Sequence, residues 1–162
     1  TGVELVERTA ALAAERGYTV YLLGAAEGVA AETAAVLRRR HPALQVVGVH
    51  AGSPHPSHDL DIIQRVRAAD PDILFVAYGA PAQDLWIRRN RAALDVPVAV
   101  GVGGTFDYLS GRVPRAPGIV RRLGFEWLYR LVRQPWRWRR QLRLPVFVLL
   151  VLRERVRRSQ HG

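Results

Sequence analysis

Short apolar runs alternate with longer, helix-forming segments along the first two thirds of the chain. The run TVYLLG at residues 19–24 is apolar, β-branched and aromatic and ends in glycine, which is typical of a buried strand. The segment before it is rich in strong helix formers, and Gly17 provides a C-cap for it. The pattern predicts helices at residues 3–16, 29–40, 57–69 and 82–94, and strands at residues 19–24, 45–49, 73–78 and 97–102.

Strands that alternate with helices of this length are typical of βαβ units, so the sequence predicts an α/β fold. We expect a Rossmann-like parallel sheet with flanking helices on both faces. Parallel sheets bind ligands beyond the carboxyl ends of their strands, and glycine there lets a ligand approach the backbone. In this chain those ends carry residues 24–28, 50–58, 79–83 and 101–107. A nucleotide or nucleotide-sugar is the expected occupant.

Charge divides the chain into two parts. The net charge is +10, and all 24 basic residues are arginine. Residues 1–110 hold 10 arginines against 12 acids, whereas residues 111–162 hold 14 arginines against only Glu126 and Glu154. We therefore divide the chain into a ligand-binding portion at 1–110 and a basic appendage at 111–162. Such an appendage indicates a polyanionic partner, either nucleic acid or an anionic membrane surface.

The appendage has an amphipathic pattern, although Pro135 interrupts it. At about 100° per residue, Arg130, Arg133, Arg137 and Arg140 fall on one side of a helix, and Trp127, Leu131, Trp138 and Leu142 fall on the other. The apolar run at 146–152 is far shorter than the roughly 20 residues that a spanning helix needs. Tryptophans packed in the core beside solvated arginines are one interpretation. We favour a basic amphipathic helical appendage that docks on a membrane surface.

Composition excludes several classes of protein. Hydrophobic residues make up 49% and charged residues 23%, as in a folded globular domain. Because there is no cysteine, disulfides, cysteine-ligated zinc and thiolate catalysis are excluded. The chain starts at Thr1, contains no methionine and has no signal-peptide pattern, so we interpret it as a fragment of a longer protein.

A histidine-rich loop offers a possible metal site. His50, His55 and His58 precede Asp59 and Asp61, and these two acids have the D-x-D spacing of many metal-dependent nucleotide-sugar transferases. The acids are equally explained by Ser57 or Asp59 capping the next helix. We expect no metal site here and no metal requirement.

Two glycine-containing turns are the main candidates for ligand binding. In GAPAQD, Gly79, Ala80 and Pro81 lead into a helix whose first turn holds Gln83, an amide that can donate and accept hydrogen bonds near unpaired N–H groups. A simple helix start, with Asp84 favouring the helix dipole, is the alternative.

The second turn is GVGGTFD at residues 101–107. Its glycines do not match G-x-G-x-x-G, so the dinucleotide fingerprint is absent. Asp107 is placed to accept a hydrogen bond from a base or a sugar hydroxyl, or else to cap a helix. An NAD-dependent or phosphate-binding α/β enzyme stays open at this point.

The sequence resembles the WecG/TagA/CpsF glycosyltransferases, glycosyltransferase family 26. Several blocks that contain rare residues follow one another in the same order as in that family. The resemblance covers essentially the whole chain. It is carried by the histidine and glycine loop and by TVYLLGAAEGVA, PDILFVAYGAPAQDLWIRRN, VAVGVGGTFDYLSGRVPRAP and LGFEWLYRLVRQPWRWRR.

The resemblance implies an inverting transferase that moves N-acetylmannosamine, or a related sugar, from a UDP donor. The acceptor would be N-acetylglucosamine on undecaprenyl diphosphate, in the synthesis of a cell-surface polysaccharide or teichoic acid. It implies a peripheral protein on the cytoplasmic face of the bacterial plasma membrane. The expected partners are the UDP-sugar, the lipid-linked acceptor and an anionic membrane, with a homo-oligomer left open and no nucleic acid. A non-enzymatic, basic nucleic-acid-binding module is the alternative.

Residue roles follow from the same resemblance. It implies that Gln83 is an active-site glutamine and Asp107 a nucleotide-pocket aspartate, and that the arginines and tryptophans of the appendage lie near the lipid diphosphate and membrane. The expected nucleotide-sugar contacts are Gly24, Gly79, Ala80, Pro81, Gly103, Gly104, Phe106 and Asp107, and the expected lipid contacts are Arg130, Arg137, Arg140, Trp127 and Trp138.

The chain departs from the family pattern in two ways. The common GAPKQE is GAPAQD here, without its lysine and with a shorter acid. The N-terminal half of the family, with the aspartate implied to be the general base, has no counterpart in this chain. We therefore expect these 162 residues alone to be catalytically inactive.

Overall fold

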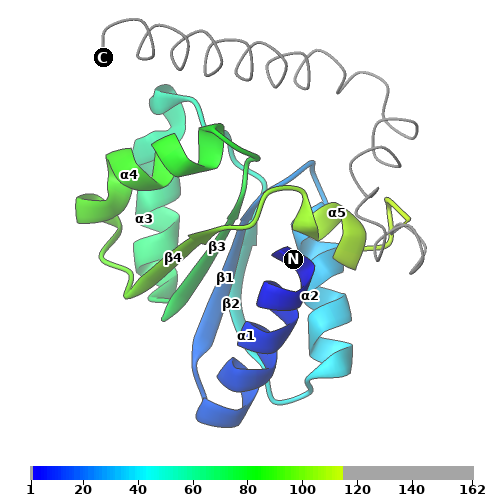
Figure 1. Cartoon of the computed structure of the whole chain (residues 1–162). Coiled ribbons are helices and arrows are strands. Elements are labelled where there is room, and N and C mark those ends of the chain that lie inside the picture. The colour runs from blue at the N-terminus through cyan, green and yellow to red at the C-terminus, as the bar shows by residue number, and fades with distance from the viewer. Residues whose placement is uncertain (1, 115–162) are drawn as a thin grey trace, which may run out of the picture. The chain divides into compact units, whose positions relative to one another are not determined.

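The computed structural model describes residues 2–114, which form a four-stranded sheet with helices on both faces (Figure 1). In chain order the elements are α1 (Gly2–Arg16), β1 (Thr19–Gly24), α2 (Val29–Arg40), β2 (Gln45–His50), the 3₁₀-helix η1 (Pro56–His58), α3 (Asp59–Ala69), β3 (Ile73–Ala77), α4 (Ala82–Leu94), β4 (Val98–Gly101) and α5 (Thr105–Leu109). The predicted alternation of strands and helices is confirmed.

All four strands are parallel, and their order across the sheet is β2-β1-β3-β4. Val20 of β1 pairs with Val46 of β2 on one side and with Ile73 of β3 on the other. The chain thus moves outward in one direction from β1 to β2 and in the other from β3 to β4. Ligands of doubly wound sheets bind where this direction reverses, which here is between β1 and β3.

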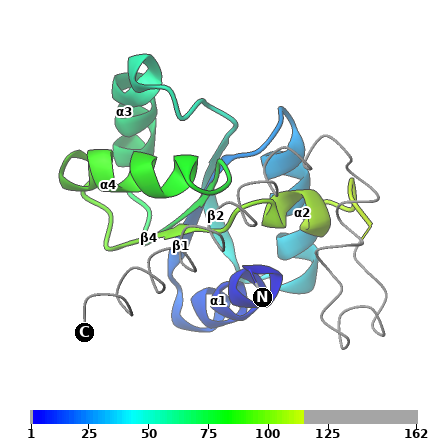
Figure 2. The same ribbon diagram turned by 45° about the horizontal axis from the view of Figure 1, so that its top comes forward.

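Helices cover both faces of the sheet, as Figure 2 shows by turning the molecule. Helices α1, α2 and α5 pack on one face around Leu22 and Phe75, and α3 and α4 pack on the other around Leu23 and Leu74. Every residue of β3 is buried, because this central strand has neighbours on both sides and helices on both faces. The α/β fold class is therefore confirmed for the described residues.

Reciprocal hydrogen bonds between Thr19 and Asp72 join the amino ends of β1 and β3. The Thr19 backbone N–H and hydroxyl donate to one carboxylate oxygen of Asp72, at 2.7 and 2.8 Å, and the Asp72 backbone N–H donates to the Thr19 hydroxyl at 2.9 Å. These bonds from Thr19 hold the pKa of Asp72 below its usual range. Asp72 thus has a structural role.

Two local predictions needed correction. Helix α3 begins at Asp59, after η1, and the side chain that caps this region belongs to His55, which accepts from the Ser57 N–H. Ser57 and Asp59 are therefore not the caps that the sequence suggested. Helix α5 is absent from the predicted helices, because a glycine-rich run precedes it, although a cap at Asp107 was left open. Each helix among residues 2–114 is too short or too polar to span a bilayer.

Candidate active site

The two glycine-containing turns meet at the carboxyl edge of the sheet. Gln83 lies in the first turn of α4 and is only 6% exposed. Its Oε1 accepts a hydrogen bond from the Gly103 backbone N–H at 2.8 Å. A Cβ atom on Gly101 would lie 2.5 Å from Nε2 of Gln83, so the amide rests directly on the end of β4. One side chain therefore joins the turn after β3 to the turn after β4.

The turn after β3 fixes where Gln83 points. Gly79 has φ +75°, the Ala80–Pro81 peptide bond is cis, and the Gln83 N–H donates to the Gly79 carbonyl at 3.0 Å. Pro81 is the N-cap of α4, and Asp84 lies in the first turn. The positive φ at Gly79 favours glycine, and the turn brings the amide of Gln83 toward β4.

The turn after β4 places Asp107 in the first turn of α5, whose N-cap is Gly104. Asp107 is therefore not a helix cap. It is partly exposed, and its charge helps to raise the pKa of Arg112, after the larger effect of Glu32. Phe106, also predicted to contact the ligand, is fully buried in the core between the sheet and the helices, so its ring is part of the packing.

Gly24 has a packing role at the point where the sheet direction reverses. Its φ is +105°, and a Cβ atom there would lie 2.8 Å from the carbonyl carbon of Ala77. The next residue, Ala25, donates its N–H to the Ala77 carbonyl at 3.1 Å. The lack of a side chain at Gly24 thus lets β1 and β3 stay paired to their ends. The structure places Gly24 at the carboxyl edge of the sheet, where the ligand was predicted to bind, but the atoms nearest to it belong to the neighbouring strand β3.

An ion pair that sequence analysis missed lies beside the turn before α2. Arg112 donates from Nε and Nη2 to the two carboxylate oxygens of Glu32, at 2.7 and 2.6 Å, and from Nη1 to the Glu27 carbonyl at 3.3 Å. These hydrogen bonds from Arg112 hold the pKa of Glu32 below its usual range. The two residues are 80 positions apart, and no local pattern marks them as partners.

The acids of the histidine-rich loop are paired with arginines. Arg89 of α4 donates to both oxygens of Asp59, at 2.6 and 2.9 Å, and Arg65 donates to Asp61 at 2.8 Å. The D-x-D carboxylates therefore have different partners, on different helices. Within residues 2–114, no group of three or more histidine and acidic side chains is arranged to hold a metal ion.

The Asp59–Arg89 pair predicts a pH dependence of stability. Arg89 is the main cause that holds the pKa of Asp59 below its usual value of about 3.9. The stabilisation is then fully present above that value and is lost as the pH falls through the lower pKa of the folded state. We expect the melting temperature of the wild type to fall more steeply below pH 4 than that of Asp59→Asn. Parallel curves from pH 6 to pH 2.5 would contradict this expectation.

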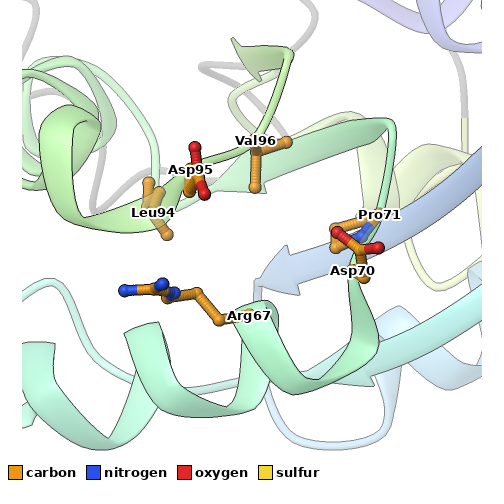
Figure 3. A pocket seen from close by; sticks show the side chains of 6 residues that line it. All are labelled: Arg67, Asp70, Pro71, Leu94, Asp95 and Val96. Carbon is orange, nitrogen blue, oxygen red and sulfur yellow. The ribbon is translucent and has the colours of Figure 1, made fainter.

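Two hollows lie at the opposite edge of the sheet. Figure 3 shows the smaller, about 150 Å³, where Arg67 of α3 points toward the end of α4 at Leu94 and Asp95. The larger hollow, about 580 Å³, shares Asp95 and Val96 and is lined also by Arg88, Arg91, Ala92 and Pro97. Because their lining residues precede β3 and β4, both hollows are remote from the Gln83 turn.

The structure thus brings Gln83, Gly101, Gly103 and Asp107 to one edge of the sheet, together with Gly24 and Gly79. The predicted lipid contacts, Arg130, Arg137, Arg140, Trp127 and Trp138, lie outside the described residues, as does nearly all of the predicted appendage at 111–162. Their roles, and the domain boundary at residue 110, stay predictions.

A doubly wound parallel sheet with glycine turns at its carboxyl edge is the architecture of nucleotide-binding α/β proteins. Comparison with known proteins identifies one family within this class. The profile of the Glycosyl transferase WecG/TagA/CpsF family matches residues 1–161. The chain belongs to this family.

Two relatives bear the name N-acetylglucosaminyldiphosphoundecaprenol N-acetyl-beta-D-mannosaminyltransferase. The protein from Bacillus spizizenii is 39% identical over 143 residues, which are 88% of this chain and 55% of the relative. The protein from Bacillus subtilis is 33% identical over 153 residues, or 94% of this chain and 59% of the relative. The chain therefore spans little more than half the length of these relatives.

Proposed function

We propose that the complete gene product transfers N-acetylmannosamine, or a related N-acetylhexosamine, from a UDP donor to N-acetylglucosamine on undecaprenyl diphosphate, with inversion. The observation that carries this proposal is the similarity over 88% and 94% of the chain to two proteins named for the mannosaminyl transfer. The convergence of the Gln83 and Gly103 turns at the carboxyl edge supports it, because that edge is where such sheets bind nucleotides.

In this proposal Gln83 orients the donor. Its Oε1 is held by the Gly103 N–H, so the amide plane is fixed before substrate arrives. Asp107 accepts a hydrogen bond from the nucleoside, and the arginines of the appendage bind the diphosphate of the lipid-linked acceptor. We assign the base that deprotonates the acceptor hydroxyl to the part of the family that this chain does not span.

The direct test uses the complete gene product with UDP-N-acetylmannosamine and undecaprenyl-diphosphate-linked N-acetylglucosamine in liposomes. We expect a lipid-linked disaccharide, and no product from residues 1–162 alone. Failure of the complete protein to transfer this or a related UDP-N-acetylhexosamine would overturn the proposed function. Transfer by the 162-residue chain would overturn the assignment of the base to other sequence.

We also propose that transfer needs no divalent metal. Both carboxylates of the D-x-D pair already accept hydrogen bonds from arginines, and a metal ion at Asp59 would have to displace Arg89. We expect the initial rate in excess EDTA to stay within about twofold of the untreated rate. Loss of activity that Mg²⁺ or Mn²⁺ restores would contradict this proposal.

We propose that the appendage brings the protein to an anionic membrane surface, at the cytoplasmic face. Because each arginine near such a surface contributes about 1 kcal/mol, Arg137→Ala and Arg140→Ala should each weaken binding to phosphatidylserine liposomes about fivefold. Flotation of liposomes at two salt concentrations measures this, and the effect should shrink at high salt. Unchanged binding by both variants would remove the proposed role of these arginines.

A further inference from the structure

Among the described residues β4 is an edge strand, yet it has the composition of an interior strand. Its sequence is VAVG, without a charge or a proline, and its register with β3 is regular. Edge strands are normally protected by charged side chains, prolines or bulges, because their outward N–H and C=O groups can recruit another strand. The other edge strand, β2, is protected, because its register with β1 shifts between Val20 and Tyr21 and it carries Gln45 and His50. The edge of the described sheet that is open to a further strand is therefore β4.

The backbone of β4 has groups that face outward. The Val98 N–H donates to the Asp72 carbonyl at 3.2 Å, on the side of β3. The Val102 N–H donates to the Val76 carbonyl on the same side, at 2.9 Å. Because these directions alternate along a strand, the N–H and C=O groups of Ala99 point away from β3. They are placed to pair with one more strand.

An exposed apolar stripe of α1 lies beside the same edge. Leu5 and Leu12 are 46% and 48% exposed. On another side of α1, Glu7 forms an ion pair with Arg40 at the end of α2, and α2 packs on β1 and β2. At about 100° per residue, Leu5 and Leu12 lie across the helix from Glu7. They therefore point away from α2, toward the side of the sheet where β4 lies (Figure 2).

Val98 continues this apolar surface onto the sheet. Val100 packs on the α1 face of the sheet, and Ala99 packs on the other face. Because side chains alternate along a strand, Val98 shares the α1 face with Val100, and it is 47% exposed. We call Leu5, Leu12 and Val98 the β4-edge patch. Single exposed apolar side chains are common, but three beside an open strand edge mark an interface.

The charge around the β4-edge patch favours one partner. Arg8 lies between the two leucines on α1, and Arg88 and Arg91 outnumber Asp95 in the hollow of about 580 Å³ beside the start of β4. The predicted appendage, with 14 arginines against two acids, would be repelled there. The two relatives offer another source of a strand, since this chain spans only 55% and 59% of their length.

We propose that β4 and the β4-edge patch bind a β-strand from the part of the family that this chain does not span, so that the sheet continues past β4 in the complete gene product. Alternate side chains of that strand are apolar and cover the patch, and acidic residues beside it face the arginines. The inference goes beyond the proposed function, because it holds whether or not the protein transfers sugar. The added strand passes beside the Gln83 turn, since Gln83 rests on Gly101 at the end of β4.

The first test is cysteine labelling of the complete gene product, because residues 1–162 contain no cysteine. Any other cysteine is replaced by serine, and Leu12→Cys and Val98→Cys are made singly. The matched controls are Leu60→Cys on α3 and Val47→Cys on β2, which are exposed away from the patch. We expect a maleimide to react at least about tenfold more slowly at the two patch positions, because they become accessible only when the interface opens. A ratio below about twofold in either matched pair would overturn the proposal.

Hydrogen exchange tests the pairing of the backbone. The N–H of Val100 faces β3, whereas that of Ala99 faces the added strand. In the complete gene product the Ala99 amide should therefore exchange at a rate within about tenfold of the Val100 rate. Exchange of the Ala99 amide at the rate of an unprotected amide would overturn the added strand.

Two further measurements identify the occupant. Removing residues 115–162 from the complete gene product should leave the labelling rates unchanged. Faster labelling of the patch alone would assign it to the appendage and overturn the proposal. Protection should also be independent of protein concentration, and protection that disappears on dilution would mean that a second copy covers the patch, which likewise overturns the proposal.

Discussion

Replacing Gly24 by alanine should lower the free energy of unfolding by about 3 kcal/mol, combining strain at positive φ with overpacking. The backbone at Gly24 has φ +105°, which L residues rarely adopt. In addition, the new Cβ would meet backbone atoms of Ala77 at 2.8 to 3.1 Å, and backbone cannot rotate away as a side chain can. Urea unfolding followed by circular dichroism measures the loss.

Gly17→Ala is the control that separates the two causes. Gly17 also has positive φ, at +75°, but no atom lies within 4 Å of the position that a Cβ would occupy. Its substitution should therefore cost only the strain, about 1 kcal/mol. Equal losses for the two variants would show that the close approach of β1 to β3 contributes nothing.

Replacing Gln83 by alanine should lower kcat/KM for sugar transfer by about 100-fold, the scale for removing a fixed hydrogen-bonding group from an active site. The same change leaves the Gly103 N–H without its partner, so stability should fall by about 1 to 3 kcal/mol. Initial rates at saturating acceptor and urea unfolding give the two numbers. Gln64→Ala, the same change at an exposed position of α3, should leave both unchanged.

A second variant separates the chemical role of Gln83 from its structural one. In Gly101→Ala the side chain of Gln83 is retained, but the new Cβ would lie 2.5 Å from Nε2 and displace the amide. Because the far end of a side chain yields easily, we expect a small loss of stability together with a large loss of activity. Full activity in Gly101→Ala would mean that the position of the amide does not matter for transfer.

The sequence predicts the sheet well because each strand is a short apolar run followed by glycine or a turn residue. The boundaries of β1 and α4 match their predicted ranges, since Gly17, Gly24 and Pro81 punctuate the chain there. Helix α5 was missed because five residues after a glycine run carry too little periodicity to be recognised.

The sequence predicted where the site lies on the sheet, but it did not predict which side chains contact one another there. Parallel strands bring their carboxyl ends to one edge, so the Gln83 and Gly103 turns were expected to be neighbours. The bond between them, the Asp59–Arg89 pair and the Glu32–Arg112 pair join residues 20, 30 and 80 positions apart. Such contacts depend on how helices pack on the sheet, and no spacing along the chain encodes them.

The contact between Gln83 and the end of β4 also constrains how this protein can diverge. A residue larger than glycine at position 101 displaces the amide of Gln83 from the Gly103 N–H, and a shorter residue at position 83 no longer reaches that N–H. Glutamine at 83 and glycine at 101 should therefore be inherited as a pair among homologues. A lineage that changes one of them should also have rebuilt the turn that follows β4.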